Sequence, residues 1–103
     1  MTGSHELTLE LATELYRRVN EGHARAFLDY LIAHPDQTVD SETIQRELSL
    51  PKHKQVALAA YAIGEGAGSL GLARPWTEGQ RGYTMPKANA RLLLDAKATL
   101  ESR

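Results

Sequence analysis

Residues 39–70 contain two helical patterns separated by a short break, and this arrangement constrains the fold more than any other part of the sequence. Asp40 can cap the first helix, because a carboxylate there accepts a hydrogen bond from an N–H that has no partner in the first turn. Val39 and Ile44 lie at the spacing of a hydrophobic staple around that cap. Pro51 ends the break and suits the first turn of the second helix. The segment therefore predicts two helices that meet at a short corner.

The second helix of this pair is predicted to bury one face and to expose the other. At 100° per residue, five apolar side chains share a narrow sector that should face the core: Val56, Ala60, Ile63, Ala67 and Leu70. The opposite side carries Lys54, Leu58, Tyr61 and Glu65. The first turn also holds Lys52, His53 and Gln55. The start of this helix is therefore cationic and polar, and it can meet phosphates or base edges.

A hairpin pattern follows the second helix. Residues 72–77 and 81–85 have the composition of two short strands around a polar turn at 78–80. Trp76 and Tyr83 can pack across the two strands. Because a tryptophan in this position more often packs on the core than on a ligand, we expect Trp76 to anchor the hairpin.

Three further helices are predicted outside this unit. Apolar residues recur at helical spacing over 8–20, 24–34 and 86–101. The segment 35–39 is expected to be a short polar connection. The three consecutive leucines at 92–94 span about 200° of the last helix, so one side of that helix cannot bury them all. The apolar surface left over predicts a homodimer through the 86–101 helix.

Length and cysteine content narrow the class of protein. A chain of 103 residues predicts one domain over 1–103, with residues 1–6 disordered or derived from a tag. No cysteine is present, which excludes disulfides and Cys-ligated metals. The longest apolar run, at 56–63, is too short to cross a bilayer, and no signal peptide is recognised. We therefore expect a cytoplasmic protein without membrane contact.

The net charge of −1 conceals an uneven distribution of charged residues. Residues 1–50 carry a net charge of −5, and residues 51–103 carry +4. If the two halves of the sequence form two ends of the domain, the basic end can face phosphates. The alternative is that both signs scatter over a solvated surface.

Several segments of the sequence have a familiar combination of helix, corner and hairpin residues. They are Phe27-Leu-Asp-Tyr-Leu31, His34-Pro-Asp-Gln-Thr-Val-Asp40, Ile44, Leu48-Ser-Leu-Pro51 and Tyr83-Thr-Met-Pro86. The stretch that contains them, from about residue 7 to residue 98, resembles the small winged helix-turn-helix proteins of bacteria, many of which have no assigned role. The resemblance implies a mainly α fold of about five helices with a two-stranded β-hairpin, the wing.

The resemblance also implies a function. In such proteins the first turn of the second helix enters the major groove of double-stranded DNA and the wing lies near the backbone. Arg74 and Arg81 flank the predicted hairpin, where a guanidinium can reach a phosphate or the minor groove. We therefore predict a DNA-binding regulator of transcription. Its predicted DNA-binding residues are Lys52, His53, Lys54, Gln55, Tyr61, Arg74 and Arg81.

Two other classes of function are alternatives to DNA binding. Leu58, Tyr61 and the last helix can instead hold a protein partner, with no DNA contact. An enzyme is not expected, because the four histidines show no paired metal-ligand spacing and no nucleophile motif is present. The run Gly66-Ala-Gly68-Ser-Leu-Gly71 matches a dinucleotide-binding pattern, but the strand that this pattern requires before it is absent from the prediction. We expect no cofactor and no metal.

Overall fold

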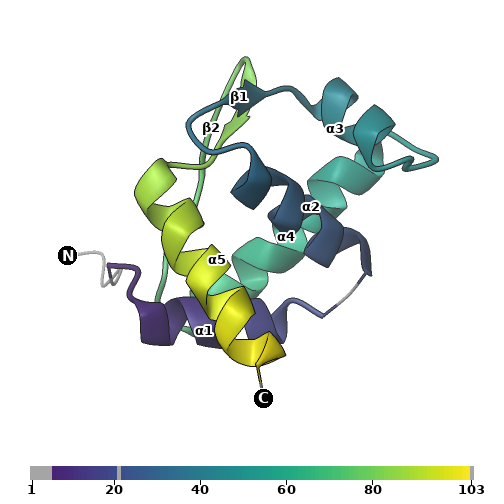
Figure 1. Ribbon diagram of the computed structural model, residues 1–103. Coiled ribbons are helices and arrows are strands. Elements are labelled where there is room, and N and C mark those ends of the chain that lie inside the picture. The colour runs from purple at the N-terminus through teal and green to yellow at the C-terminus, as the bar shows by residue number, and fades with distance from the viewer. Residues whose placement is uncertain (1–5, 21, 103) are drawn as a thin grey trace.

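The computed structural model describes residues 6–20 and 22–102 (Figure 1). In chain order the elements are α1 (Leu9–Arg18), α2 (Gly22–Ala33), β1 (Thr38–Val39), α3 (Ser41–Glu47), α4 (Lys54–Ser69), β2 (Thr77–Gly79), β3 (Gly82–Thr84) and α5 (Lys87–Glu101). The expected mainly helical fold with a small sheet is confirmed. The sheet described here has three strands, however, and not the predicted two. Of the segment 1–6, predicted to be disordered or tag-derived, residues 1–5 lie outside the described residues.

The helices pack around one core. α1 lies along α5, while α2 packs on both α4 and α5. Figure 1 shows α1 and the end of α5 at one end of the molecule, and α3 and the hairpin at the other. The predicted apolar stripe of α2 is buried throughout, at Ala24, Phe27, Leu28, Leu31 and Ile32. The predicted inner face of α4 is also confirmed, with Val56, Ala60, Ile63 and Ala67 buried and Leu70 packed against the core.

Aromatic side chains fasten the hairpin to α2. The ring centroid of Phe27 lies 5.3 Å from that of Trp76 and 5.2 Å from that of Tyr83, both in edge-to-face geometry. Trp76 and Tyr83 approach each other at 6.3 Å across the hairpin. Such pairs add roughly 0.5–1.5 kcal/mol each beyond the burial of their surface. The prediction that Trp76 anchors the hairpin on the core is confirmed.

The segment 35–39 is more than the polar connection that the sequence predicts. Within it, β1 pairs antiparallel with β3, Thr38 opposite Thr84 and Val39 opposite Tyr83. The resulting sheet has the order β1-β3-β2. A strand of two residues has no alternation that can be recognised in a sequence, and its partner lies 46 residues further along the chain. β1 therefore could not be predicted from the sequence, because it is defined by its pairing with β3 in the folded chain.

Gly82 allows β1 and β3 to approach closely. Its φ of 131° lies in a region that L side chains rarely adopt. A Cβ atom on Gly82 would lie 2.2 Å from the carbonyl oxygen of Val39 and 2.7 Å from the Cα atom of Asp40. Because both are backbone atoms, rotation of a side chain cannot relieve the contact. The hairpin is thus held directly against the residue that begins α3.

The hairpin differs from its prediction in length and in the position of its turn. Gln80 and Arg81 are the two turn residues, in place of the predicted 78–80. Residues 73–76, within the predicted first strand, lie outside β2. Pro75 explains part of this difference, because it has no N–H to donate to a strand ladder.

α4 ends at a left-handed glycine. Gly71 has a φ of 74°, and its N–H donates to the carbonyl of Gly68 at 3.0 Å. The N–H of Leu72 donates to the carbonyl of Ala67 at 2.9 Å, which completes a Schellman motif. Gly66 and Gly68 lie inside the helix. The glycine run is therefore the end of a helix, whereas a dinucleotide-binding loop lies between a strand and the start of a helix.

The corner between α3 and α4 is confirmed, but α4 begins three residues after Pro51 and not at it. Ser49 adopts a left-handed φ of 55°, and the N–H of Leu50 donates to the carbonyl of Gln45 at 2.9 Å. This turn directs Leu50 into the core, where 5% of it is exposed. The following residues make hydrogen bonds of the i to i+3 type, as Val56 does to the carbonyl of His53 at 3.1 Å. The chain therefore tightens into turns before the α-helical pattern starts.

The start of α5 is capped from a distant part of the chain. The carboxylate Oδ1 of Asp36 accepts a hydrogen bond from the N–H of Lys87 at 2.9 Å. The N–H of Asp36 donates to the carbonyl of Met85 at 2.8 Å, and Asp36 has a left-handed φ of 62°. Pro86, the residue before α5, makes no side-chain cap. Asp36 therefore supplies the cap that the local sequence lacks.

A polar cluster joins α1 to α2 and α5. The hydroxyl of Tyr16 donates to Asp29 at 2.7 Å, and the ammonium of Lys97 lies 3.7 Å from the other carboxylate oxygen of Asp29. Arg25 lies over the ring of Tyr16 and donates to the carbonyl oxygens of Tyr16 and Val19, at the end of α1. Burial, together with the hydrogen bond to Asp29, raises the pKa of Tyr16 to about 12.

Candidate nucleic-acid interface

The start of α4 presents three exposed polar side chains, those of Lys52, His53 and Lys54. Lys52 and His53 lie in the turns before the helix, and Lys54 is its first residue. The imidazole Nε2 of His53 lies 3.1 Å from the hydroxyl of Ser41, the first residue of α3. The helix N-terminus adds its partial positive charge to the two ammonium groups. This end of α4 therefore favours an anion such as a phosphate.

Gln55 is less accessible to a base edge than the sequence predicts. It is half-buried, and its amide oxygen accepts a hydrogen bond from the N–H of Lys52 at 3.1 Å. His53, the residue at the N-cap position, makes no side-chain cap. Gln55 therefore supports the start of α4, and its amide oxygen is already occupied.

Tyr61 lies on the outer side of α4, two turns after the cationic start. Its exposed fraction is 58%, the same as that of Leu58 one turn before it. Lys54 and Glu65 are exposed on the same helix, so the predicted outer face of α4 is confirmed. Tyr61 and Leu58 give this face an apolar middle section.

Arg74 is held in place by the protein. Its guanidinium Nη1 lies 2.6 Å from the Oε1 atom of Glu78, which also accepts a hydrogen bond from the indole of Trp76 at 3.0 Å. The side chain crosses α4 at Gly64, where a Cβ atom would lie 2.7 Å from Nε of Arg74. Because Glu78 already neutralises this cation, Arg74 is less available to a phosphate than the sequence suggests.

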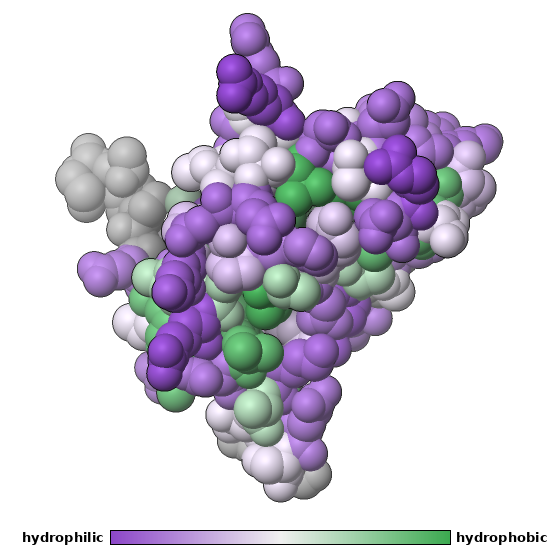
Figure 2. All heavy atoms as spheres, turned by 45° about the horizontal axis from the view of Figure 1, so that its top comes forward, coloured by the Kyte–Doolittle hydropathy of each residue, from purple (hydrophilic) through white to green (hydrophobic). Residues whose placement is uncertain are grey.

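Arg81 is exposed in the turn of the hairpin. A shallow hollow separates this turn from the start of α3, with Asp40 and Ser41 on one side and residues 78–83 on the other. Ser41 also contacts His53, so the start of α3 lies between the cationic start of α4 and the hairpin turn. Figure 2 shows hydrophilic side chains over the hairpin and α3 at this end of the molecule.

Acidic groups from the first half of the sequence also reach this end. α3 packs on α4 and carries exposed Glu42 and Glu47 beside Arg46. Asp40 caps α3 by accepting a hydrogen bond from the N–H of Thr43 at 2.7 Å, and this bond lowers the pKa of Asp40 below its usual value. The acidic and basic halves of the sequence therefore do not form two separate ends, and the alternative of mixed charges describes this surface.

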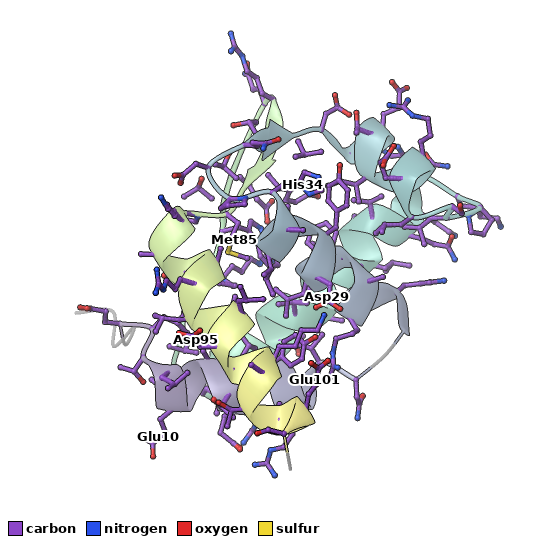
Figure 3. All side chains as sticks on the ribbon, in the orientation of Figure 1. Glu10, Asp29, His34, Met85, Asp95 and Glu101 are labelled. Atoms are coloured by element: carbon purple, nitrogen blue, oxygen red, sulfur yellow. The ribbon has the colours of Figure 1, made fainter. Side chains whose placement is uncertain are left out.

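Among residues 6–20 and 22–102, no group of three His, Asp or Glu side chains is placed to hold a metal ion. The ring Nδ1 of His34 lies 2.8 Å from the carbonyl of Tyr30, and its ring stacks on that tyrosine (Figure 3). His34 is therefore positioned by Tyr30 in the last turn of α2. In the same part of the chain, no helix combines the length and the apolar character needed to cross a bilayer.

Comparison with models of protein families, with curated proteins and with solved structures finds no match to this chain. The geometry of the described residues is therefore the basis for assigning a function. Of the predicted residues, Lys52, His53 and Lys54 form one group, Arg81 lies beyond the start of α3, and Tyr61 lies further along α4.

Sequence reasoning missed two residues that shape this surface. Ser41 positions the His53 ring, and Glu78 holds Arg74 against α4. Arg74 and Glu78 are four residues apart in the sequence, but this spacing predicts an ion pair only when both residues are in a helix. No local signal exists for the contact between Ser41 and His53, because it depends on the corner between their helices.

Proposed function

We propose that this protein binds DNA as a member of the winged helix-turn-helix class and regulates transcription. The element order α2-β1-α3-α4-β2-β3 and the sheet order β1-β3-β2 support this class, since they combine a helix pair with a β-hairpin. In the proposal α4 docks its first turn in the major groove, and the hairpin region from 72 to 85 contacts the backbone. A regulator of bacterial DNA works in the cytoplasm, which is the proposed compartment.

The exposed cationic start of α4 is the observation that carries the proposal. Within the part of the chain that the structure describes, neither Lys52 nor Lys54 makes an ion pair, and the same is true of Arg81. Unpaired cations beside a helix N-terminus are suited to phosphate oxygens. Three phosphate contacts are therefore available without the loss of any bond that holds the fold together.

Binding through phosphates is favoured over extensive reading of bases. Beyond its first turn the exposed face of α4 has polar groups at Tyr61 and Glu65, but Ala57, Leu58 and Ala62 can only make apolar contacts, such as one with a thymine methyl. Lys52 and Lys54 at its start can reach the O6 and N7 acceptors of a guanine. We therefore propose modest sequence preference on top of a strong electrostatic contribution.

A second candidate function is a protein-interaction module that does not bind DNA. The observation that favours it is the pair Leu58 and Tyr61, each 58% exposed on the same face of α4. The acidic groups of α3 beside this face also weaken attraction to a polyanion. For such a module, affinity for the partner would depend little on salt, because apolar contacts are not screened.

The test is a titration of fluorescein-labelled random and genomic duplexes, followed by anisotropy at 50, 100 and 200 mM salt. For three phosphate contacts, affinity should fall about 40-fold between 50 and 200 mM salt, because the logarithmic slope is about −0.9 per contact. Lys52→Ala/Lys54→Ala leaves one of the three contacts and should reduce this fall to about 3.5-fold.

Arg17→Ala/Arg18→Ala is the control, since it removes two exposed cations from α1 at the other end of the molecule, where Arg17 pairs with Glu14 and Arg18 donates to Ser69. This variant should bind as the unmodified protein does. Absence of binding at 50 mM salt, or equal losses in the two double variants, would exclude the DNA-binding proposal. Loss of binding to a protein partner in Leu58→Glu would then support the interaction module.

A further inference from the structure

The outer face of α5 has an apolar centre. Among the three consecutive leucines, Leu93 is buried and Leu92 packs partly against the core, whereas 54% of Leu94 is exposed. This confirms that the helix cannot bury all three. Leu94 borders a shallow hollow to which Ile32 and Pro35 of the neighbouring segment contribute. Figure 2 shows hydrophobic surface on the side where α5 lies, bordered by hydrophilic side chains.

Opposite charges flank this apolar centre along the helix. Lys87 and Arg91 lie before Leu94, and Asp95 and Glu101 lie after it, all four exposed. At 100° per residue these side chains and Leu94 share a sector of about 120°. Figure 3 labels Asp95 and Glu101 on the second half of α5. Within residues 6–20 and 22–102, none of the four makes an ion pair.

We propose that α5 packs antiparallel on α5 of a second copy of this chain, with Leu94 against Leu94 at a twofold axis. Lys87 and Glu101 each lie seven residues from Leu94, about 10.5 Å along the axis, so the antiparallel arrangement brings each lysine opposite the other copy's glutamate. Arg91 reaches Asp95 of the other copy across an axial offset of about 3 Å. The face is therefore complementary to itself, which is what a twofold interface requires.

This self-complementarity identifies a second copy as the occupant of the face. The contact leaves α3 and the start of α4 uncovered, because they lie away from α5 on the other side of the molecule (Figure 1). One helix face buries less than the roughly 800 Å² per partner of a standard interface, so the dimer should form only at high micromolar concentration. The proposal does not depend on DNA binding.

Sedimentation equilibrium of the full chain from about 5 to 500 μM tests the dimer. The weight-average mass should rise from 11.4 kDa toward twice that value. Leu94→Glu should remain monomeric over the whole range, because two carboxylates would meet at the axis. The matched control is Leu58→Glu, which places the same charge on α4 at an equally exposed leucine and should dimerise normally. A protein that is monomeric at every concentration, or equal behaviour of the two variants, would overturn the proposal.

Charge reversal tests the antiparallel geometry. Arg91→Glu alone and Asp95→Arg alone each create two repulsive contacts, and each should weaken dimerisation roughly three- to tenfold. An equimolar mixture of the two variants should restore it, since in a mixed pair both contacts again join opposite charges. Both substitutions are at exposed sites, and thermal melts check that the fold is retained. Failure of the mixture to recover would contradict the antiparallel arrangement.

Discussion

Substitution of Gly82 by alanine tests whether the contact between β1 and β3 holds the start of α3 against the hairpin. The added Cβ would lie 2.2 Å from the carbonyl oxygen of Val39, at a φ of 131°. Backbone strain of this kind costs about 1–3 kcal/mol. Relief of the contact requires β1 to move away from β3. Each hydrogen bond lost between the two strands lowers the free energy of unfolding by a further amount of about 0.5–1.5 kcal/mol. We expect Gly82→Ala to lower the free energy of unfolding by about 3 kcal/mol.

Gly79 provides the matched control within the same hairpin. It lies opposite Gly82 in the β2–β3 ladder, and nothing lies within 4 Å of a Cβ atom placed on it. Gly79→Ala should change the free energy of unfolding by less than about 0.5 kcal/mol. Urea denaturation followed by the fluorescence of Trp76 measures both variants, and in thermal melts the loss at Gly82 should lower Tm by about 12–24 °C. Equal small losses in the two variants would refute the close approach at Gly82.

Substitutions at three other residues test separate features of the structure. Asp36→Ala should cost about 1–2 kcal/mol in urea denaturation, because it removes the cap of α5, whereas Asp36→Asn should retain most of the stability. The pKa of Tyr16 is raised to about 12, so the unfolded chain loses this proton first, and the free energy of unfolding should fall as pH rises from about 10 to 12. Thermal melts of Tyr16→Phe should show a smaller fall over that range. Glu78→Gln should release Arg74 and strengthen DNA binding several-fold in the anisotropy assay, while an unchanged affinity would mean that Arg74 does not contact DNA.

The helices could be predicted because their signals are local. Asp40 caps α3 from the adjacent residue, and Val56 and Ile63 repeat at the spacing that places them on one face of α4. Features that join distant segments left no comparable signal. The cap that Asp36 gives α5 and the pairing of Thr38 with Thr84 both connect residues about 50 positions apart, and their existence depends on the packed core.

The candidate interface was predictable to a similar extent. Lys52 and Lys54 are exposed where the sequence predicts, because hydrophilic residues beside a turn remain in water. Arg74 is held by Glu78, and Gln55 caps the start of α4. In the fold, another residue forms a hydrogen bond with the polar group of each of these side chains. The sequence shows that the polar groups exist, but it does not show which residues they contact.

In the proposed complex, the start of α4 and the hairpin turn contact DNA together. Chemical-shift mapping of backbone amides in ¹⁵N-labelled protein, with a short duplex at 50 mM salt, tests this arrangement. The largest changes are expected at Lys52, Lys54 and Arg81, with little change along α5. Changes confined to α5, or none at a millimolar concentration of duplex, would contradict it.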